Sequence, residues 1–354
     1  MNFGYFILTK NENIYICKKN ISIIIRIHFS ENVKNKMNAI EIKDLKKYYN
    51  KGKIKAVDGI SLKVPKGSRF GFLGPNGAGK TTTIRCILGF LNPDSGITMI
   101  NGEEINPKKD VKIRNQIGYL PGELGLYKYM TAEQLIKYFA KLFDIEIDWK
   151  FIKDVTERLE IEMHRKMGVL SKGNKQKVGV LTAIMGKFDI LIMDEPTSGL
   201  DPLMQSEFYR IIAERQEESN CTVFVSSHVL PEIEKFCDHV AIIKNGKIVE
   251  VSTIEELKKK SLKRIELDFE NNKSLAEFNS FLLSDFPEAI VKQNYQERIE
   301  FLLPYNQSRD ILQYISKNKW AGMPIKDFNI THSTLDNIFL EYYKDSNSKG
   351  GEAV

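Results

Sequence analysis

The stretch Gly74-Pro-Asn-Gly-Ala-Gly-Lys80-Thr81 decides the fold, because it fits the pattern G-x-x-x-x-G-K-[ST] without a mismatch. It follows a short apolar run, Ser68–Leu73, which is expected to form a strand, and it opens an apolar segment, Thr82–Phe90, which is expected to form a helix. In this setting glycines let backbone N–H groups approach phosphate oxygens, and the helix N-terminus adds positive charge. We therefore expect a phosphate-binding loop and not a chance glycine-rich turn.

Each part of this loop has an expected contact with nucleotide. The Lys80 ammonium supplies a point charge at the β- and γ-phosphates, and the Thr81 hydroxyl supplies a hard oxygen for Mg²⁺. Thr82 is expected to reach the α-phosphate. The full set assigned to ATP is Gly74, Pro75, Asn76, Gly77, Ala78, Gly79, Lys80, Thr81 and Thr82. The loop alone indicates that phosphate is bound, and it would fit a GTPase or a kinase as well.

An acidic motif further along the chain indicates hydrolysis. The run Ile190-Leu-Ile-Met-Asp194-Glu195 is an apolar strand that ends in two carboxylates. Asp194 is suited to hold Mg²⁺ through its water shell, whereas Glu195 is placed to polarise the attacking water. A strand that ends in acidic residues is common, but after a phosphate-binding loop it predicts a nucleotide hydrolase.

Short apolar runs predict an α/β fold with a mostly parallel central sheet. Ile190–Met193 and Thr222–Val225 are nearly uninterrupted, as expected of strands that helices cover on both faces. Functional residues at the carboxyl ends of such strands suit this topology. Asn245-Gly246, between Val240–Ile243 and Lys247–Val251, is a strong signal for a type I′ hairpin.

Beyond residue 260 the pattern predicts a small α+β domain. Ile265, Leu267 and Phe269 alternate with charged residues, which is typical of a half-buried strand. The elements that follow are a helix at 275–283, strands at 289–292 and 298–303, a helix at 309–317 and a strand at 325–330. This order matches a ferredoxin-like split unit. A final helix is expected from Ser333, with Asp336 as its capping-box acid.

These patterns divide the chain into four segments. Residues 37–260 are expected to form the nucleotide-binding domain, with a mostly helical subdomain at about 115–185. Residues 261–345 form the accessory domain, and residues 346–354 a disordered tail. Residues 1–36 show no periodic pattern. Our hypothesis is that the functional start is Met37, and a partner-binding tail is the alternative.

The composition argues against several other classes of protein. Of the 354 residues, 42% are hydrophobic and 28% are charged, which is ordinary for a globular protein. The longest apolar stretches, such as Ile21–Ile25, are shorter than the ~18–20 residues of a membrane-spanning helix. The net charge of +6 comes from interleaved bases and acids, so no nucleic-acid partner is expected. Cys17, Cys86, Cys221 and Cys237 lack a metal-binding spacing and are expected to be thiols in a reducing compartment.

Further motifs resemble those of the ABC ATPase family, from the first strand at Ile40 to the hairpin. Leu170-Ser-Lys-Gly-Asn174 is similar to the family's signature motif and lies upstream of the acidic strand. Ser198-Gly-Leu-Asp201 resembles the D-loop, and His228 ends the next strand as the family's switch histidine does. Tyr49 lies where the family has an aromatic residue that stacks on adenine. Tyr48 is the alternative.

The resemblance implies a site shared between two chains. Ser171 and the Gly173 amide would complete the nucleotide site of a second domain in trans, and Asp201 would cross the same interface. ATP would then hold two domains together, and hydrolysis would release them and move a membrane partner. The expected partners are a second copy or a related ATPase chain, and a separately encoded permease at the cytoplasmic face of the cell membrane.

The chain departs from the family pattern at two places. Lys172 and Asn174 stand where the signature motif has a glycine and a glutamine. Gly122 occupies the place of a glutamine that touches Mg²⁺ in the family, and our hypothesis is that Glu123 substitutes as an oxygen ligand. Thr334-Leu-Asp-Asn-Ile-Phe-Leu340 resembles the closing helix of many drug- and antibiotic-export subunits, which favours an exporter; a plain amphipathic helix is the alternative.

Two other functions remain to be weighed against a transporter motor. A soluble ABC ATPase that acts on ribosomes or nucleic acid usually has two ATPase units or a long coiled coil, and the sequence shows neither. A sensor that binds ATP without turnover disagrees with the presence of Lys80, Glu195 and His228. The sequence therefore predicts an ATPase subunit of an exporter.

Overall fold

The computed structural model covers most of the chain. It describes residues 6–10, 13–18, 21–25, 38–105, 113, 115–125, 127–260, 262–295, 297–304, 307–317 and 325–332. The chain divides into two units, Met1–Met37 and Asn38–Val354. The expected final helix, the segment Thr334–Leu340 within it and the expected disordered tail lie outside the described residues.

The first unit contains a small antiparallel sheet. Strands β1 (Phe6–Lys10), β2 (Asn13–Lys18) and β3 (Ile21–Ile25) pair in chain order. No strand or helix was expected here, because residues 1–36 show no periodic pattern, and the three strands differ from that expectation. Their isoleucine-rich runs have high strand propensity but do not alternate apolar with polar residues, so the period-two signal is missing.

The second unit is built on a six-stranded sheet in the order β13-β12-β6-β11-β10-β9. From β12 to β9 all neighbours pair in parallel, and β13 is added antiparallel at the edge. The bounds are β6 Arg69–Leu73, β9 Ile117–Leu120, β10 Ile190–Asp194, β11 Thr222–Ser227, β12 His239–Lys244 and β13 Lys247–Thr253. This confirms the expected α/β fold with a mostly parallel sheet.

Both faces of the central strands are buried, and successive side chains enter different cores. In β10, Ile190 and Ile192 pack into one cluster of buried apolar residues, whereas Leu191 and Met193 pack into another. In β11, Phe224 shares the cluster of Ile190 and Ile192. Because side chains alternate along a strand, a run that is apolar throughout requires cover on both sides.

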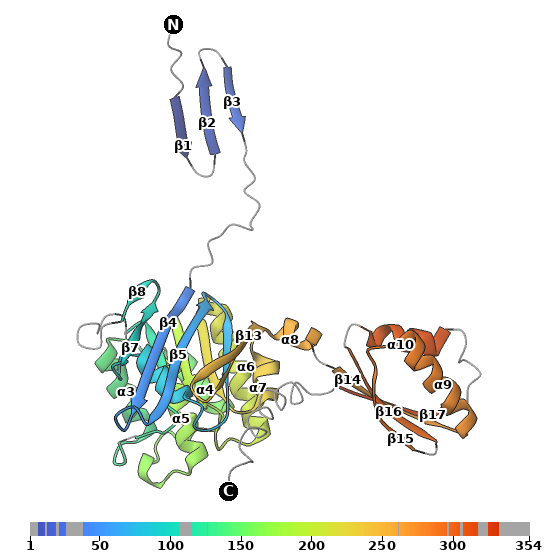
Figure 1. Ribbon diagram of the computed structural model, residues 1–354. Coiled ribbons are helices and arrows are strands. Elements are labelled where there is room, and N and C mark those ends of the chain that lie inside the picture. The colour runs from blue at the N-terminus through green and yellow to red at the C-terminus, as the bar shows by residue number, and fades with distance from the viewer. Residues whose placement is uncertain are drawn as a thin grey trace. The chain divides into compact units, whose positions relative to one another are not determined.

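One face of this sheet is covered by helix α1 and by a four-stranded antiparallel sheet. Helix α1 spans Lys80–Ile87, and its Ile84 and Ile87 share the core of the antiparallel strands. That sheet has the order β5-β4-β7-β8, with bounds β4 Asn38–Tyr49, β5 Ile54–Pro65, β7 Ser95–Ile100 and β8 Glu103–Glu104. Figure 1 shows the long β4 and β5 ribbons lying side by side.

The other face carries the helices of the nucleotide-binding region. Their bounds are α3 Ala132–Phe143, α4 Trp149–Arg158, α5 Lys172–Ile184, α6 Pro202–Ser219, α7 Leu230–Phe236 and α8 Ile254–Lys260. Three of them, α3 to α5, lie in the expected helical subdomain. The expectation of a mostly helical segment missed β9, which joins the sheet beside β10. β9 has four residues and contains Gly118, so no pattern distinguished it from its surroundings.

The hairpin between β12 and β13 confirms the turn expected from Asn245-Gly246. Asn245 has φ +48° and Gly246 has φ +75°, as a type I′ turn requires. The amide of Asp58 donates to the carbonyl of Gly246 at 2.8 Å, and the amide of Gly246 donates to the carbonyl of Ala78 at 3.0 Å. The hairpin therefore ties β5 to the glycine-rich loop.

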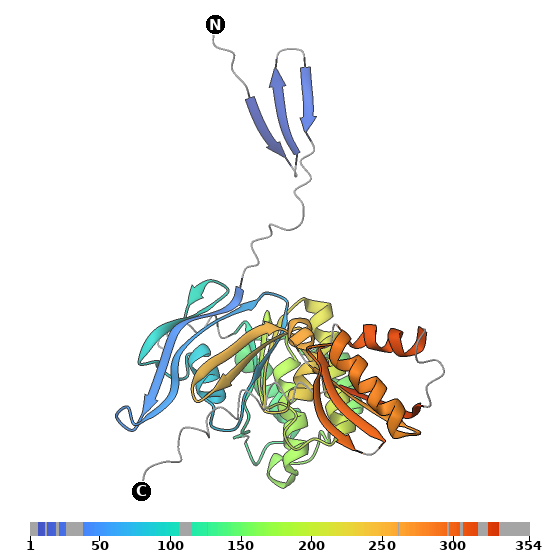
Figure 2. The ribbon, with the colours of Figure 1, turned by 45° about the vertical axis from the view of Figure 1, so that its right-hand side comes forward.

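The accessory domain has its own sheet and its own core. Strands β14 (Leu262–Phe269), β15 (Ile290–Tyr295), β16 (Arg298–Pro304) and β17 (Ile325–His332) lie in the order β15-β16-β14-β17, and every neighbouring pair is antiparallel. Helices α9 (Asn272–Asp285) and α10 (Ser308–Lys317) lie on one face, as Figure 2 shows. This order and pairing are those of a split βαββαβ unit.

The cysteines and the lengths of the helices agree with the composition. Cys86, Cys221 and Cys237 are free and buried, and burial raises the pKa of the Cys86 thiol to about 11. None of the helices within the described ranges is both long and apolar enough to cross a membrane.

Close packing of β9 against α5 depends on Gly118. A Cβ atom there would lie 2.3 Å from the carbonyl oxygen of Ala183 and 2.5 Å from a methyl group of Leu191. We expect Gly118→Ala to lower the free energy of unfolding by ~1–3 kcal/mol through overpacking. Urea denaturation measures this, and Gly125→Ala is the control because nothing lies within 4 Å of a Cβ at that position. Equal stability of the two variants would contradict the prediction.

Candidate functional site

The glycine-rich loop is fixed at both ends by contacts with the sheet. The amide of Gly74 donates to the carbonyl of Ser227 at 3.1 Å. A Cβ at Gly74 would lie 2.5 Å from the carbonyl oxygen of Ile243, and one at Gly79 would lie 2.2 Å from that of Ala56. Gly79 also has φ +108° at the start of α1. A Cβ at Gly77, in contrast, would point into open space. Packing therefore requires glycine at positions 74 and 79, whereas position 77 has open space beside it.

Lys80 lies inside the curve of this loop. Its side chain is buried, and its Nζ donates to the carbonyl oxygens of Gly74 at 2.6 Å and Pro75 at 3.1 Å. The same Nζ forms an ion pair with Oε1 of Glu195 at 3.1 Å. The ammonium group is thus held where the loop can present it to an anion.

Asp194 lies between two hydroxyl groups. Thr81 donates to its Oδ2 at 2.7 Å, and Ser226 donates to its Oδ1 at 2.5 Å. Only 1% of Asp194 is exposed. The register of β10 and β11 places Asp194 directly opposite Ser226, which explains the second contact. This set of hard oxygen donors beside a phosphate-binding loop could hold Mg²⁺.

Glu195 is oriented by contacts at both carboxylate oxygens. Oε1 pairs with Lys80, while Oε2 lies 2.7 Å from Nδ1 of His228. Its backbone has φ +50°, and its amide donates to the carbonyl and the hydroxyl of Ser226. A left-handed backbone is unfavourable for glutamate, so the surrounding contacts hold this carboxylate in its position. Lys80, Asp194, Glu195 and His228, which were predicted from separate motifs, thus converge at one edge of the sheet.

The segment after β9 passes directly beside Asp194. A Cβ at Gly122 would lie 3.3 Å from the carbonyl oxygen of Asp194 and 3.5 Å from its Oδ2. Burial and the charge of Asp194 raise the pKa of Tyr119 to about 12. The Glu123 side chain is exposed. The position that departs from the family pattern is therefore adjacent to the candidate metal ligand.

The signature motif forms the start of α5 and contacts the D-loop of its own chain. Ser171 caps the helix, and its Oγ accepts from the amide of Asn174 at 3.2 Å. The Nζ of Lys172 donates to Oγ of Ser198 at 3.1 Å, and a Cβ at Gly173 would lie 2.5 Å from the carbonyl oxygen of Gly199. Among the residues that the structure describes, no hydrogen bond joins Ser171 or Gly173 to the glycine-rich loop.

Asp201 and Tyr49 lie apart from the catalytic cluster. Asp201 caps α6, and its Oδ1 accepts from the amides of Leu203 and Met204. Tyr49 ends β4 and is 37% exposed. The alternative, Tyr48, donates its hydroxyl to Asp58 at 2.5 Å, which raises the pKa of the phenol and lowers that of the carboxyl. Tyr49 is thus the more available of the two tyrosines for stacking.

Several contacts in this region were missed from the sequence. Ser226 donates to Asp194, and the carbonyl of Ser227 accepts from the amide of Gly74. The Nε2 of Gln176 donates to the carbonyl of Pro196 at 2.9 Å. The pair Ser226-Ser227 at the end of an apolar strand was a usable signal. The role of Gln176 was not readable, because its partner is 20 residues away in the chain.

Comparison with known proteins places this geometry in a family. Residues 57–198 match the model of the family described as ABC transporter. This range includes the glycine-rich loop, the signature motif, Asp194 and Glu195, and it excludes Tyr49 and His228.

Curated relatives extend the match over more of the chain. The bacitracin transport ATP-binding protein BcrA of Bacillus licheniformis is 40% identical over 67% of this chain and 77% of its own length. The ABC transporter ATP-binding protein NatA of Bacillus subtilis is 36% identical over 58% of this chain and 84% of its own. The glucosylceramide transporter ABCA12 of Mus musculus is 31% identical over 84% of this chain, which spans only 12% of that much longer protein.

Solved structures agree with these relatives. The ATP binding subunit of an ABC transporter has a TM-score of 0.56 at 27% identity, over 62% of this chain and 92% of its own. A dimeric bacterial ABC transporter cassette also has a TM-score of 0.56, over 61% of this chain and 98% of its own; at 23% identity it shows the fold alone. Together with the convergence of Lys80, Asp194, Glu195 and His228, these matches show that the chain belongs to the ABC transporter family of ATP-binding ATPases.

Proposed function

We propose that this ATPase is the motor subunit of an exporter, and that it binds Mg²⁺–ATP, pairs with a second ATPase chain and drives a separately encoded permease. The observation that carries the proposal is the contact of Glu195 with both Lys80 and His228, directly beside the buried Asp194. The relative named for bacitracin transport supports transport of a compound of that kind.

The loop residues would bind the phosphates of ATP. The Lys80 ammonium donates to the carbonyl oxygens of Gly74 and Pro75. Phosphate oxygens of ATP would replace these two acceptors. The amides from Gly77 to Thr82 lie at the positive end of α1. Tyr49 would stack on the adenine ring. Thr81 and Asp194 would hold Mg²⁺, which neutralises charge on the β- and γ-phosphates.

Glu195 would act as the general base toward the attacking water. A general base must touch the water from which it takes a proton. The ion pair with Lys80 and the contact with His228 fix the direction of the Glu195 carboxylate. His228 is about half exposed, so its ring can also face the γ-phosphate. The pair thus combines a base with a donor that stabilises developing charge.

A second ATPase chain is proposed because, in the part of the chain that the structure describes, no hydrogen bond joins Ser171 or Gly173 to the phosphate-binding loop of the same chain. Lys172 and Gly173 contact the D-loop, and Ser171 caps α5, so the N-terminus of this helix could bind an anion. A γ-phosphate bound by another copy or a related chain would meet these groups. Asp201 would lie at the same interface.

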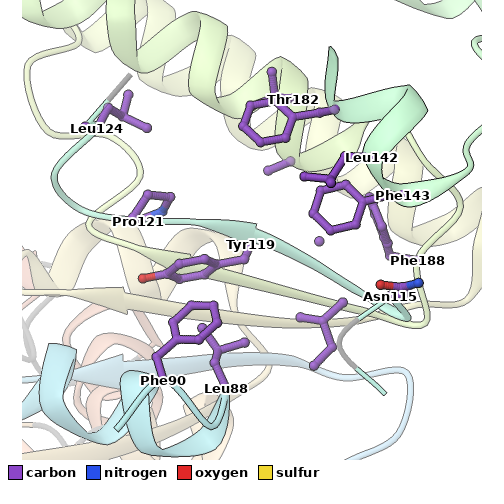
Figure 3. Close-up of a pocket in the computed structure, with 15 residues that line it drawn as sticks. Leu88, Phe90, Asn115, Tyr119, Pro121, Leu124, Leu142, Phe143, Thr182 and Phe188 are labelled. Carbon is purple, nitrogen blue, oxygen red and sulfur yellow. The ribbon is translucent and has the colours of Figure 1, made fainter. Parts of the chain in front are cut away.

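A groove beside the site fits a permease segment. It has a volume of about 520 Å³, and Figure 3 shows Phe90 and Tyr119 on one side and Leu142 and Phe143 on the other. Both Phe90 and Leu142 are 58% exposed, which is high for large apolar side chains. Pro121 lines the groove and precedes Gly122, where a Cβ atom would lie 3.3 Å from the carbonyl oxygen of Asp194. We propose that a cytoplasmic segment of the permease occupies it and places the ATPase at the inner face of the membrane.

The first test removes the base. Glu195→Gln keeps the shape of the side chain but cannot take a proton, so turnover should fall by ~10²–10⁴-fold while ATP still binds. With ATP and Mg²⁺ present, size-exclusion chromatography should show a dimer for this variant. Glu217→Gln, an exposed residue of α6, is the matched control. A Glu195→Gln monomer that hydrolyses ATP at the wild-type rate would refute the assignment.

The second test asks whether Glu123 takes the role of the glutamine that the family has in place of Gly122. If Glu123 supplies an oxygen to Mg²⁺, Glu123→Ala should raise the Mg²⁺ concentration for half-maximal turnover about tenfold, a loss of ~1.4 kcal/mol. Glu146→Ala, at another exposed glutamate in the loop between α3 and α4, should leave it unchanged. Mg²⁺ titration of the steady-state ATPase rate measures both. Identical curves for Glu123→Ala and wild type would end the hypothesis.

The third test concerns the groove. Leu142→Glu places a charge on its apolar wall and should reduce the amount of chain recovered with a polytopic membrane protein from detergent-extracted membranes, because the permease segment would lose apolar contact. The ATPase rate of the isolated chain should not change. Leu283→Glu is the control, since that leucine is 54% exposed but belongs to the accessory domain. Equal recovery of the two variants would argue against this docking surface.

A further inference from the structure

We propose that Glu232 is a positioning residue for hydrolysis. Its side chain joins the end of β11, next to His228, to the turn that leads into the D-loop. Glu232 belongs to α7 and lies four residues after His228, outside the motifs named above. The inference rests on the proposed function, since it assigns to Glu232 a role in the two-chain site described above.

A single oxygen of Glu232 collects hydroxyl groups from three different elements. Its Oε2 accepts from Thr197 at 2.9 Å, from Ser227 at 3.1 Å and from Tyr209 at 3.1 Å. Thr197 lies in the turn after β10, Ser227 ends β11, and Tyr209 belongs to α6. Hydrogen bonds to an ionised acceptor are about twice as strong as those between neutral groups, so this one carboxylate connects three segments firmly.

The surroundings make this arrangement costly to disturb. Thr197 is 5% exposed and Ser227 is 1% exposed. Burial and the nearby carboxylate of Glu232 raise the pKa of Tyr209, so its hydroxyl keeps the proton that it donates. Within the described ranges Glu232 forms no ion pair, and the three hydroxyls therefore supply its stabilisation. Removing the carboxylate would leave three donors in a largely dry site without their acceptor.

The three hydrogen bonds connect the Glu195–His228 pair to the D-loop, which contacts the start of α5. Ser227 is the residue before His228, and its Oγ also accepts from the amide of Val229 at 2.9 Å, so the backbone on both sides of His228 is held. Thr197 begins the turn whose next residue, Ser198, accepts from Lys172. Glu232 thus sets the position of the Glu195–His228 contact relative to the D-loop.

The place of Glu232 in the structure predicts that it affects turnover and not the binding of nucleotide. Capture of nucleotide by one chain uses Lys80 and Thr81, neither of which contacts Glu232. Turnover requires, in addition, that the D-loop and His228 are aligned at the interface between two chains. Displacement by about 1 Å can cost on the order of a hundredfold in rate, so loss of Glu232 should affect turnover while nucleotide binding persists.

The test compares Glu232→Ala, Glu232→Gln and Glu234→Gln in the full chain. Glu234 lies on the same helix and pairs with Lys258 on the surface, so its variant controls for general effects on α7. We expect Glu232→Ala to lower kcat at least about tenfold with the KM for ATP within about twofold of wild type. Glu232→Gln retains an acceptor oxygen and should restore most of kcat. Thr197→Val combined with Glu232→Ala should be no worse than Glu232→Ala alone.

A second measurement separates positioning from loss of fold. In the Glu195→Gln background, Glu232→Ala should reduce the ATP-dependent dimer, whereas Glu234→Gln should not, when both are compared well below their melting temperatures and with unchanged binding of a fluorescent ATP analogue. The inference is overturned if Glu232→Ala matches Glu234→Gln in kcat and in dimer formation. It is also overturned if kcat falls only in proportion to folded protein. Absence of hydrolysis and of a dimer in the parent proteins would overturn the proposed function, and this inference with it.

Discussion

The parallel pairing of β6, β11, β10 and β9 is the constraint on which the rest of the structure depends. Strands that run in one direction bring their carboxyl ends to one edge, so the segments that follow them meet there although they are far apart in the chain. Burial on both faces fixes the register, because a shift of one residue would exchange the two apolar faces of β10 and separate Asp194 from Ser226.

Much of this arrangement could be predicted because it rests on local patterns. The glycine-rich loop has a fixed spacing, the Asn245-Gly246 turn has a required backbone geometry, and strands covered on both sides are apolar throughout. The strand and helix order of the accessory domain also followed from alternation and periodicity. Lys80, Asp194 and Glu195 were found because they open or end such elements, and His228 was found through the resemblance to the family.

What could not be predicted depends on which segments become neighbours. β9 is short and contains Gly118, whose need for close packing against Ala183 is visible only in three dimensions. The tight contacts that require glycine at positions 74 and 79 come from Ile243 and Ala56, and the partners of Glu232 come from three separate elements. A single sequence carries no signal for such distant pairs, and the burial that gives them their strength is a property of the fold.

The separate core of the accessory domain has a consequence for how the protein can change over time. Phe269, Phe278 and Phe301 pack within that domain's own cluster of buried residues. Its stability is therefore supplied locally, and substitutions on its outer surface need no compensation in the nucleotide-binding domain. Substitutions on the surface of strands β14 to β17 can therefore accumulate while the residues that carry ATP hydrolysis stay unchanged.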